Sequence, residues 1–211
     1  MADKRKISVT EALKELKLYD SKIAKAINAS GFVGAKKKSV DKVGVQKTST
    51  FIDKAKSDYQ SILDLISNRA AIKAAIVQSN ANTVVEIAGD KYTVAQAIER
   101  KNSIEYEKLL LDEMKSQWVS STTTIDRENK KVDAQVDKML EAFLGKDSDK
   151  KVSETDLSVI SDQYRNKNEW ELVDPLDLYT KMTALETQID AFEADVDIRL
   201  SISNSITYIE V

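Results

Sequence analysis

The chain has 211 residues, of which 42% are hydrophobic and 32% charged, with a formal net charge of −3 and neither cysteine nor histidine. This apolar content is enough for a buried core and argues against disorder along the whole chain. The missing cysteine and histidine exclude disulfides, thiolate nucleophiles, histidine-based catalytic triads and the usual zinc sites. We therefore expect no enzyme activity, no catalytic residues, no cofactor and no metal.

The longest uncharged stretch, Ala74 to Val85, is much shorter than the roughly 20 apolar residues that span a bilayer. No apolar block follows the polar N-terminal residues, so no secretory signal is indicated. The sequence therefore predicts a cytoplasmic protein without a membrane span.

Charge is distributed unevenly along the chain. Residues 1–47 contain 12 Lys/Arg and 5 Asp/Glu, whereas residues 152–211 contain 4 and 13. This polarity can attract a nucleic acid or an anionic surface to the basic part, or let opposite ends of identical subunits attract each other. Two solvated surfaces of opposite sign are the simplest interpretation.

The first half of the chain predicts two helices and a hairpin. Ser8 and Glu11 form a capping-box pattern, which predicts a helix from Val9. A second helix is expected from about Ser49 to Gln78, with apolar residues at helical spacing. Its stripe contains Ile52, Ala55, Tyr59, Ile62, Ile66, Ala70, Ile76 and Val77. Between the two helices, residues 31–48 hold three of the five glycines and predict a flexible basic loop. A β-hairpin is expected at about residues 83–92.

The third predicted helix, from about residue 94 to 144, has the clearest periodicity. Apolar residues recur every seven positions, which indicates a seam packed against partner helices. They are Ala97, Ile104, Leu111, Trp118, Ile125, Val132 and Met139. The Ser/Thr run at 120–124 has poor helix propensity, so a continuous helix and a helix broken there both remain open.

The last part begins with a predicted exposed link, residues 145–152, and a short helix capped by Ser153. Residues 169–173 are expected to be extended, and Asp174 followed by Pro175 predicts the start of the last helix. Its apolar stripe contains Leu178, Met182, Leu185, Ile189, Phe192 and Val196. Residues 205–211 predict a terminal strand. The expected fold is a mainly α antiparallel bundle or coiled coil in a single domain, residues 1–211, with a small sheet formed by the hairpin and the C-terminal strand.

Two sets of residues are candidates for contact with partners. The first is a group of lysines in the basic loop that could bind an anion or a nucleic acid. It contains Lys36, Lys37, Lys38, Lys42 and Lys47. The second set, Trp170 and Tyr208, could contact a protein partner; Trp170 lies in a polar stretch, unlike Trp118 on the seven-residue repeat.

Five further segments are distinctive in their order along the chain: Thr10–Leu13, Ser79–Thr83, Gly89–Arg100, Leu172–Leu176 and Val196–Asn204. Together they resemble the septicolysin-like family of small helical proteins of bacteria and tailed phages. The resemblance implies a mainly helical fold, carries over no catalytic residues, and makes a role in the virion or its assembly an expectation. A phage-encoded protein would then occur in the host cytoplasm and the virion.

Three functions follow in order of preference. The first is a non-enzymatic structural or assembly protein, as in a tailed-phage virion, that forms homo-oligomers or binds other virion proteins through its helices. The second is a nucleic-acid or anionic-surface binder that uses the basic N-terminal part. The third, a septicolysin-like membrane-active protein, is least favoured because the chain offers neither a long apolar stretch nor a strongly amphipathic strand pair.

Overall fold

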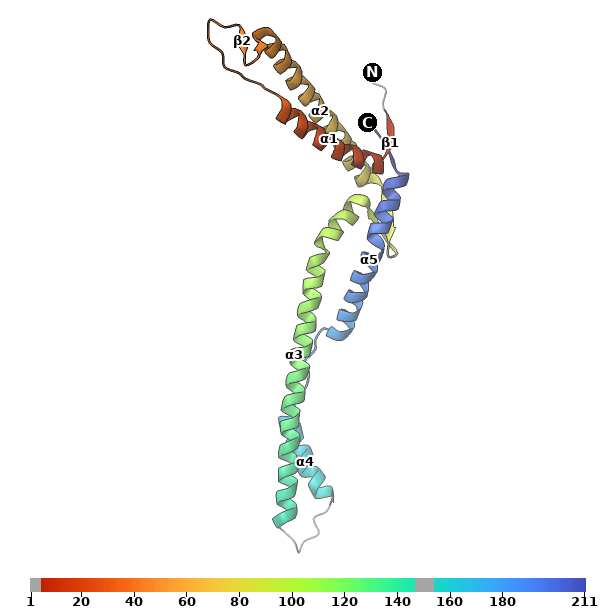
Figure 1. The fold of residues 1–211 in the computed structure, drawn as a ribbon. Coiled ribbons are helices and arrows are strands. Elements are labelled where there is room, and N and C mark those ends of the chain that lie inside the picture. Colours follow the sequence, from red (N-terminus) through yellow and green to blue (C-terminus); the bar gives the residue numbers. More distant parts are fainter. Residues whose placement is uncertain (1–4, 147–153) are drawn as a thin grey trace. The chain divides into compact units, whose positions relative to one another are not determined.

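The computed structural model describes residues 5–146 and 154–211, which are mainly helical (Figure 1). The helices are α1 (Val9–Ala29), α2 (Thr48–Asn82), α3 (Val94–Lys146), α4 (Glu154–Asn168) and α5 (Leu178–Ile206). The strands are β1 (Lys6–Ser8), β2 (Lys42–Val43), β3 (Gln46–Lys47), β4 (Val84–Ile87), β5 (Asp90–Thr93) and β6 (Tyr208–Glu210). The predicted mainly helical fold with small antiparallel sheets is confirmed.

The chain divides into two compact units. The first contains the residues up to 102 together with 191–211, and the second contains residues 103–190. The single domain over residues 1–211 stays a prediction. Of the predicted exposed link, residues 145 and 146 end α3, while 147–152 and the predicted cap Ser153 lie outside the described residues.

In the first unit, α1 and α2 form an antiparallel hairpin (Figure 1), and its buried core lies beside strands β1 and β6. The predicted capping box begins α1: the Glu11 backbone N–H donates to Ser8 Oγ at 3.2 Å, and the Ser8 N–H donates to Glu11 Oε2 at 2.8 Å. These two bonds satisfy backbone donors that a helix start leaves free. Strands β1 and β6 then pair, with Ile7 opposite Ile209, and bring apolar side chains onto the helices. The buried cluster contains Ile7, Val9, Ala12, Leu16, Ile72, Ile76 and Ile209.

A second part of this unit is built around the β4–β5 hairpin and the end of α5. Ala88 and Gly89 both have positive φ, 51° and 88°, as a two-residue type I′ turn requires. Asp195 on α5 accepts a hydrogen bond from the Ala88 N–H at 3.1 Å and one from Arg199 Nε at 2.9 Å. These bonds lower the pKa of Asp195, so the carboxylate that fixes the turn is ionised at neutral pH.

Phe192 fills the space beneath this hairpin. Its side chain is 1% exposed, and its ring lies edge-on to Tyr92 with centroids 5.9 Å apart. The guanidinium of Arg100 lies 4.6 Å from the Phe192 ring centroid, within the range of a cation–π contact. Met182, Ile189 and Val196 of the predicted α5 stripe are buried as well, so these positions of the stripe are confirmed.

In the second unit, α3 carries the predicted seven-residue repeat, and Ile104, Leu111 and Val132 are buried. Contacts to α5 include the Lys115–Glu186 ion pair at 2.6 Å and the rings of Trp118 and Tyr179, 5.8 Å apart. Farther along α3, Arg165 of α4 pairs with Asp133 at 2.5 Å. The repeat thus packs against helices of the same chain.

The structure settles the open question about residues 120–124: α3 is continuous there. The Thr122 hydroxyl donates to the Trp118 carbonyl at 2.8 Å, one turn earlier. This bond gives the threonine hydroxyl a partner within the helix.

Two predicted details are wrong. The C-terminal strand pairs with β1 instead of the β4–β5 hairpin, and within the described residues the β1–β6, β2–β3 and β4–β5 sheets are separate.

The last helix begins at Leu178, not at Pro175, because Asp177 has a left-handed φ of 53°. Asp174 still acts as a cap, since its carboxylate accepts from the Leu178 N–H at 2.8 Å and the Leu176 N–H at 3.1 Å.

Candidate functional site

The predicted basic loop, residues 31–48, connects α1 and α2 at the end of the hairpin far from β1 (Figure 1). It contains the small β2–β3 ladder, in which Lys42 is opposite Lys47. Gly34 permits this fold, because a Cβ there would clash with Val43 and would lie 3.2 Å from the Phe51 ring. The loop therefore folds back on the start of α2; its flexibility stays a prediction.

The five candidate lysines are all exposed on this loop. In the described part of the chain none of their ammonium groups forms an ion pair, and only Lys36 makes a hydrogen bond, to the Val40 carbonyl at 3.2 Å. Lys42 and Lys47 lie together on paired strands, and Lys36 to Lys38 are consecutive. The structure thus gathers the predicted lysines into one positively charged loop.

Next to the basic loop, α1 and α2 form an apolar groove of about 530 Å³ that the sequence did not predict. Phe32, from the loop itself, packs edge-on against Tyr59 with ring centroids 6.3 Å apart. The groove is lined by Ile27, Phe32, Ala55, Lys56, Tyr59, Ile62, Leu63 and Ile66. Several of these side chains are exposed, including Tyr59 at 56% and Ile66 at 44%.

Groove residues Ala55, Tyr59, Ile62 and Ile66 belong to the apolar stripe that the sequence predicted along α2. Only Ile62 of these is buried. The β1–β6 ladder adds a third layer at the opposite end of the hairpin, where Ile72 and Ile76 are buried. Nothing in the described residues adds such a layer over the groove. The sequence feature that could have predicted the groove is an apolar helix stripe that begins directly after a basic loop.

Trp170, the second predicted contact, lies in the connection between α4 and α5. We call residues 169–177 the acidic strap. It has no regular secondary structure, and the predicted extended segment forms no strand. The Asn129 side chain on α3 holds it: Asn129 Nδ2 donates to the Trp170 carbonyl at 3.0 Å, and the Trp170 N–H donates to Asn129 Oδ1 at 2.8 Å. The Trp170 backbone is therefore fixed while its side chain is 52% exposed.

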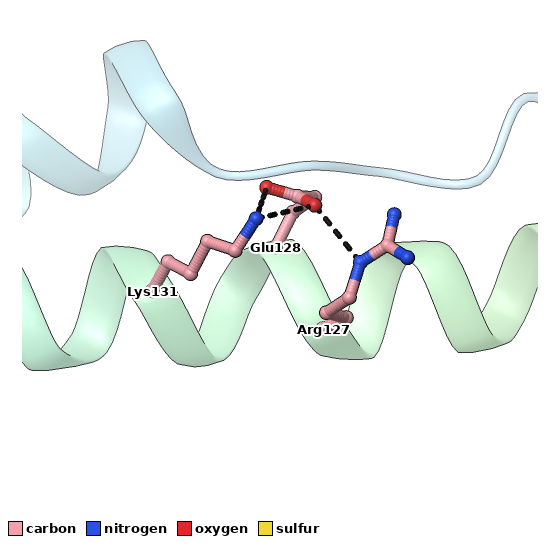
Figure 2. Close-up of polar contacts among 3 residues, drawn as sticks. All are labelled: Arg127, Glu128 and Lys131. Carbon is pink, nitrogen blue, oxygen red and sulfur yellow. Dashed lines mark hydrogen bonds and ion pairs between the residues drawn. The ribbon is translucent and has the colours of Figure 1, made fainter.

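The α3 surface beside Asn129 carries a small ion cluster. Figure 2 shows Glu128 between Lys131, whose Nζ lies 2.8 Å from both carboxylate oxygens, and Arg127, whose Nε lies 3.0 Å from Oε1. These hydrogen bonds, the one from Lys131 first, lower the pKa of Glu128. Glu128 is therefore ionised at neutral pH and pairs with both cations.

Tyr208, the third predicted contact, is exposed on β6, in the first unit. Its ring lies 5.6 Å from Lys6 Nζ on the neighbouring strand β1. The structure places it on the terminal ladder and brings it together with neither the basic loop nor the groove.

Within residues 5–146 and 154–211, no helix combines the length and the apolar character needed to cross a bilayer. In the same part of the chain, no three acidic side chains are grouped as a metal site would require.

The chain matches no protein-family model, no curated protein and no solved structure. The resemblance to the septicolysin-like family stays a prediction.

Proposed function

We propose that the protein is a non-enzymatic structural or assembly protein that associates with further copies of itself or with other proteins. The observation that carries this proposal is the apolar groove beside the basic loop, where Phe32, Tyr59 and Ile66 are exposed together. Contiguous exposed apolar surface costs solvation free energy and is typical of interaction sites. The resemblance to the septicolysin-like family adds the expectation of a tailed-phage virion component.

The acidic strap supports the same proposal. Its four large apolar residues, Trp170, Leu172, Val173 and Leu176, are all exposed, and Val173 is 83% exposed. Trp is among the residues that contribute most to binding at protein interfaces. A strap held by Asn129 presents these side chains without first having to become ordered.

Sedimentation velocity tests the proposal. We expect the average mass of the pure protein to exceed 23.6 kDa and to rise with protein concentration, because exposed apolar surface is buried on association. The virion expectation predicts that the protein is present in purified particles of a phage that encodes it. A monomer at every concentration, together with absence from such particles, would contradict the proposal.

Binding to nucleic acid or to an anionic surface is the second candidate function, favoured by the exposed lysines without ion pairs. A gel shift with duplex DNA should then weaken steeply with salt, because bound lysines displace counterions from phosphates. Replacing Lys36, Lys37 and Lys38 with glutamine should lower the salt slope by about one per lost phosphate contact. A shift that is unchanged by these replacements, or no shift at all, would rule this function out.

A further inference from the structure

The groove and the loop beside it define the chemistry of a ligand that would fit. Residues 31–48 contain five lysines and one acidic residue, Asp41, and Lys56 lies on the groove wall itself. All other groove-lining residues are apolar or aromatic. A matching ligand therefore combines large apolar side chains with negative charge, since complementary charges favour encounter and fix orientation.

The acidic strap has this composition. Residues 169–177 contain Glu169, Glu171, Asp174 and Asp177 and no basic residue. The exposed apolar side chains of the strap alternate with these carboxylates along the sequence. The net charge of the strap is −4, and the net charge of residues 31–48 is +4, so the two charges are equal in size and opposite in sign.

The strap is also held in one backbone conformation. Asn129 makes two hydrogen bonds to the Trp170 backbone. The Asp174 carboxylate accepts one from the Leu176 N–H within the strap and one from the Leu178 N–H at the start of α5. Fixing a binding segment in advance reduces the entropy that association would otherwise cost.

We propose, on the basis of the proposed function, that the groove of one copy binds the acidic strap of a second copy. The exposed Trp170 and Leu172 enter the apolar groove, while strap carboxylates lie against the basic loop. Because the two surfaces differ, the contact is heterologous, and each copy keeps a free groove or a free strap for the next. Copies therefore join head to tail, in a closed ring or an open chain.

Two single variants of the full chain test the two sides of this contact. Trp170→Ala removes the main apolar anchor, and Tyr59→Glu places a negative charge in the groove, where it repels the strap. Each should weaken self-association at least about tenfold, because a buried aromatic anchor commonly contributes this much or more. The matched controls are Tyr106→Ala and Val77→Glu, at residues that are also exposed and lie on α3 and α2. They should assemble as the wild type does, and circular dichroism should show all four variants folded.

Mixing the two defective variants is the decisive measurement. Trp170→Ala retains an intact groove and Tyr59→Glu an intact strap, so an equimolar mixture should form a 1:1 heterodimer that grows no further. A mixture that stays monomeric overturns the head-to-tail contact. Wild-type assembly that neither variant weakens also overturns it, but leaves the proposed structural function in place. A wild type that never self-associates overturns the contact, and presence in particles would then still support the proposed function.

Discussion

Replacing Phe192 with alanine is expected to lower the free energy of unfolding of the first unit by about 3–5 kcal/mol. Phe192 is 1% exposed, so the truncation removes buried apolar surface and leaves a cavity beneath the β4–β5 hairpin. It also removes the edge-on contact with Tyr92 and the ring face that Arg100 contacts. Chemical denaturation followed by circular dichroism measures the loss.

Ile198→Ala on the same helix is the matched control, because Ile198 is mostly exposed. It should change the free energy of unfolding by no more than about 0.5 kcal/mol. Hydrogen exchange shows which part of the unit is destabilised. The amides of residues 84–93 should exchange faster in Phe192→Ala, while those of α1 keep more of their protection. An unfolding free energy equal to that of the wild type would show that Phe192 does not hold the hairpin on α5.

Helices and their caps were predictable because their signals are local. The Ser8–Glu11 box fixes the start of α1, and Thr93 and Gln96 form the same reciprocal pair at the start of α3, with bonds of 2.8 and 3.1 Å. The last helix stripe was predictable because its residues repeat at three and four. Its start was misplaced by three residues, since proline after aspartate is also compatible with a turn, and Asp177 makes that turn.

Strand pairing was not predictable in the same way. Residues 6–8 and 208–210 are at opposite ends of the chain, and β1 is too short to show a strand periodicity of its own. Its polar flanks gave no signal that Ile7 would be buried. The predicted C-terminal strand was therefore assigned to the nearest available hairpin, β4–β5.

The candidate surfaces also differ in whether a local stretch of sequence predicts them. The lysines of the basic loop could be predicted because a short stretch rich in glycine and lysine contains all of them. Trp170 could be predicted because it stands in a short polar, acidic stretch. The groove could not, because a periodic stripe such as Tyr59, Ile62 and Ile66 has the same pattern whether or not a third layer covers it. Burial along α1 shows the consequence. Val9, Ala12 and Leu16 are buried near the terminal ladder. Tyr19, Ile23 and Ala26, which continue the same helix face toward the groove, are only half-buried.

The terminal β1–β6 ladder is the site of the second substitution expected to have a large effect on stability. Ile209→Ala is expected to lower the free energy of unfolding of the first unit by about 2–5 kcal/mol. Ile209 is 6% exposed and joins the cluster that contains Ile72 and Ile76 of α2 and Leu16 of α1. It lies opposite Ile7, so its truncation opens the core on the side where β1 and β6 cover the helices.

Tyr208→Ala serves as the control, because the strand alternation turns Tyr208 outward while Ile209 faces the core. It removes only an exposed ring and its contact with Lys6, and should cost about 1 kcal/mol or less. In Ile209→Ala, the Arg5 and Val211 amides, which bond each other's carbonyls at 2.8 and 2.9 Å, should also lose protection from hydrogen exchange. Equal losses of stability in the two variants would mean that the terminal ladder contributes through its exposed face and that Ile209 does not anchor it to α1 and α2.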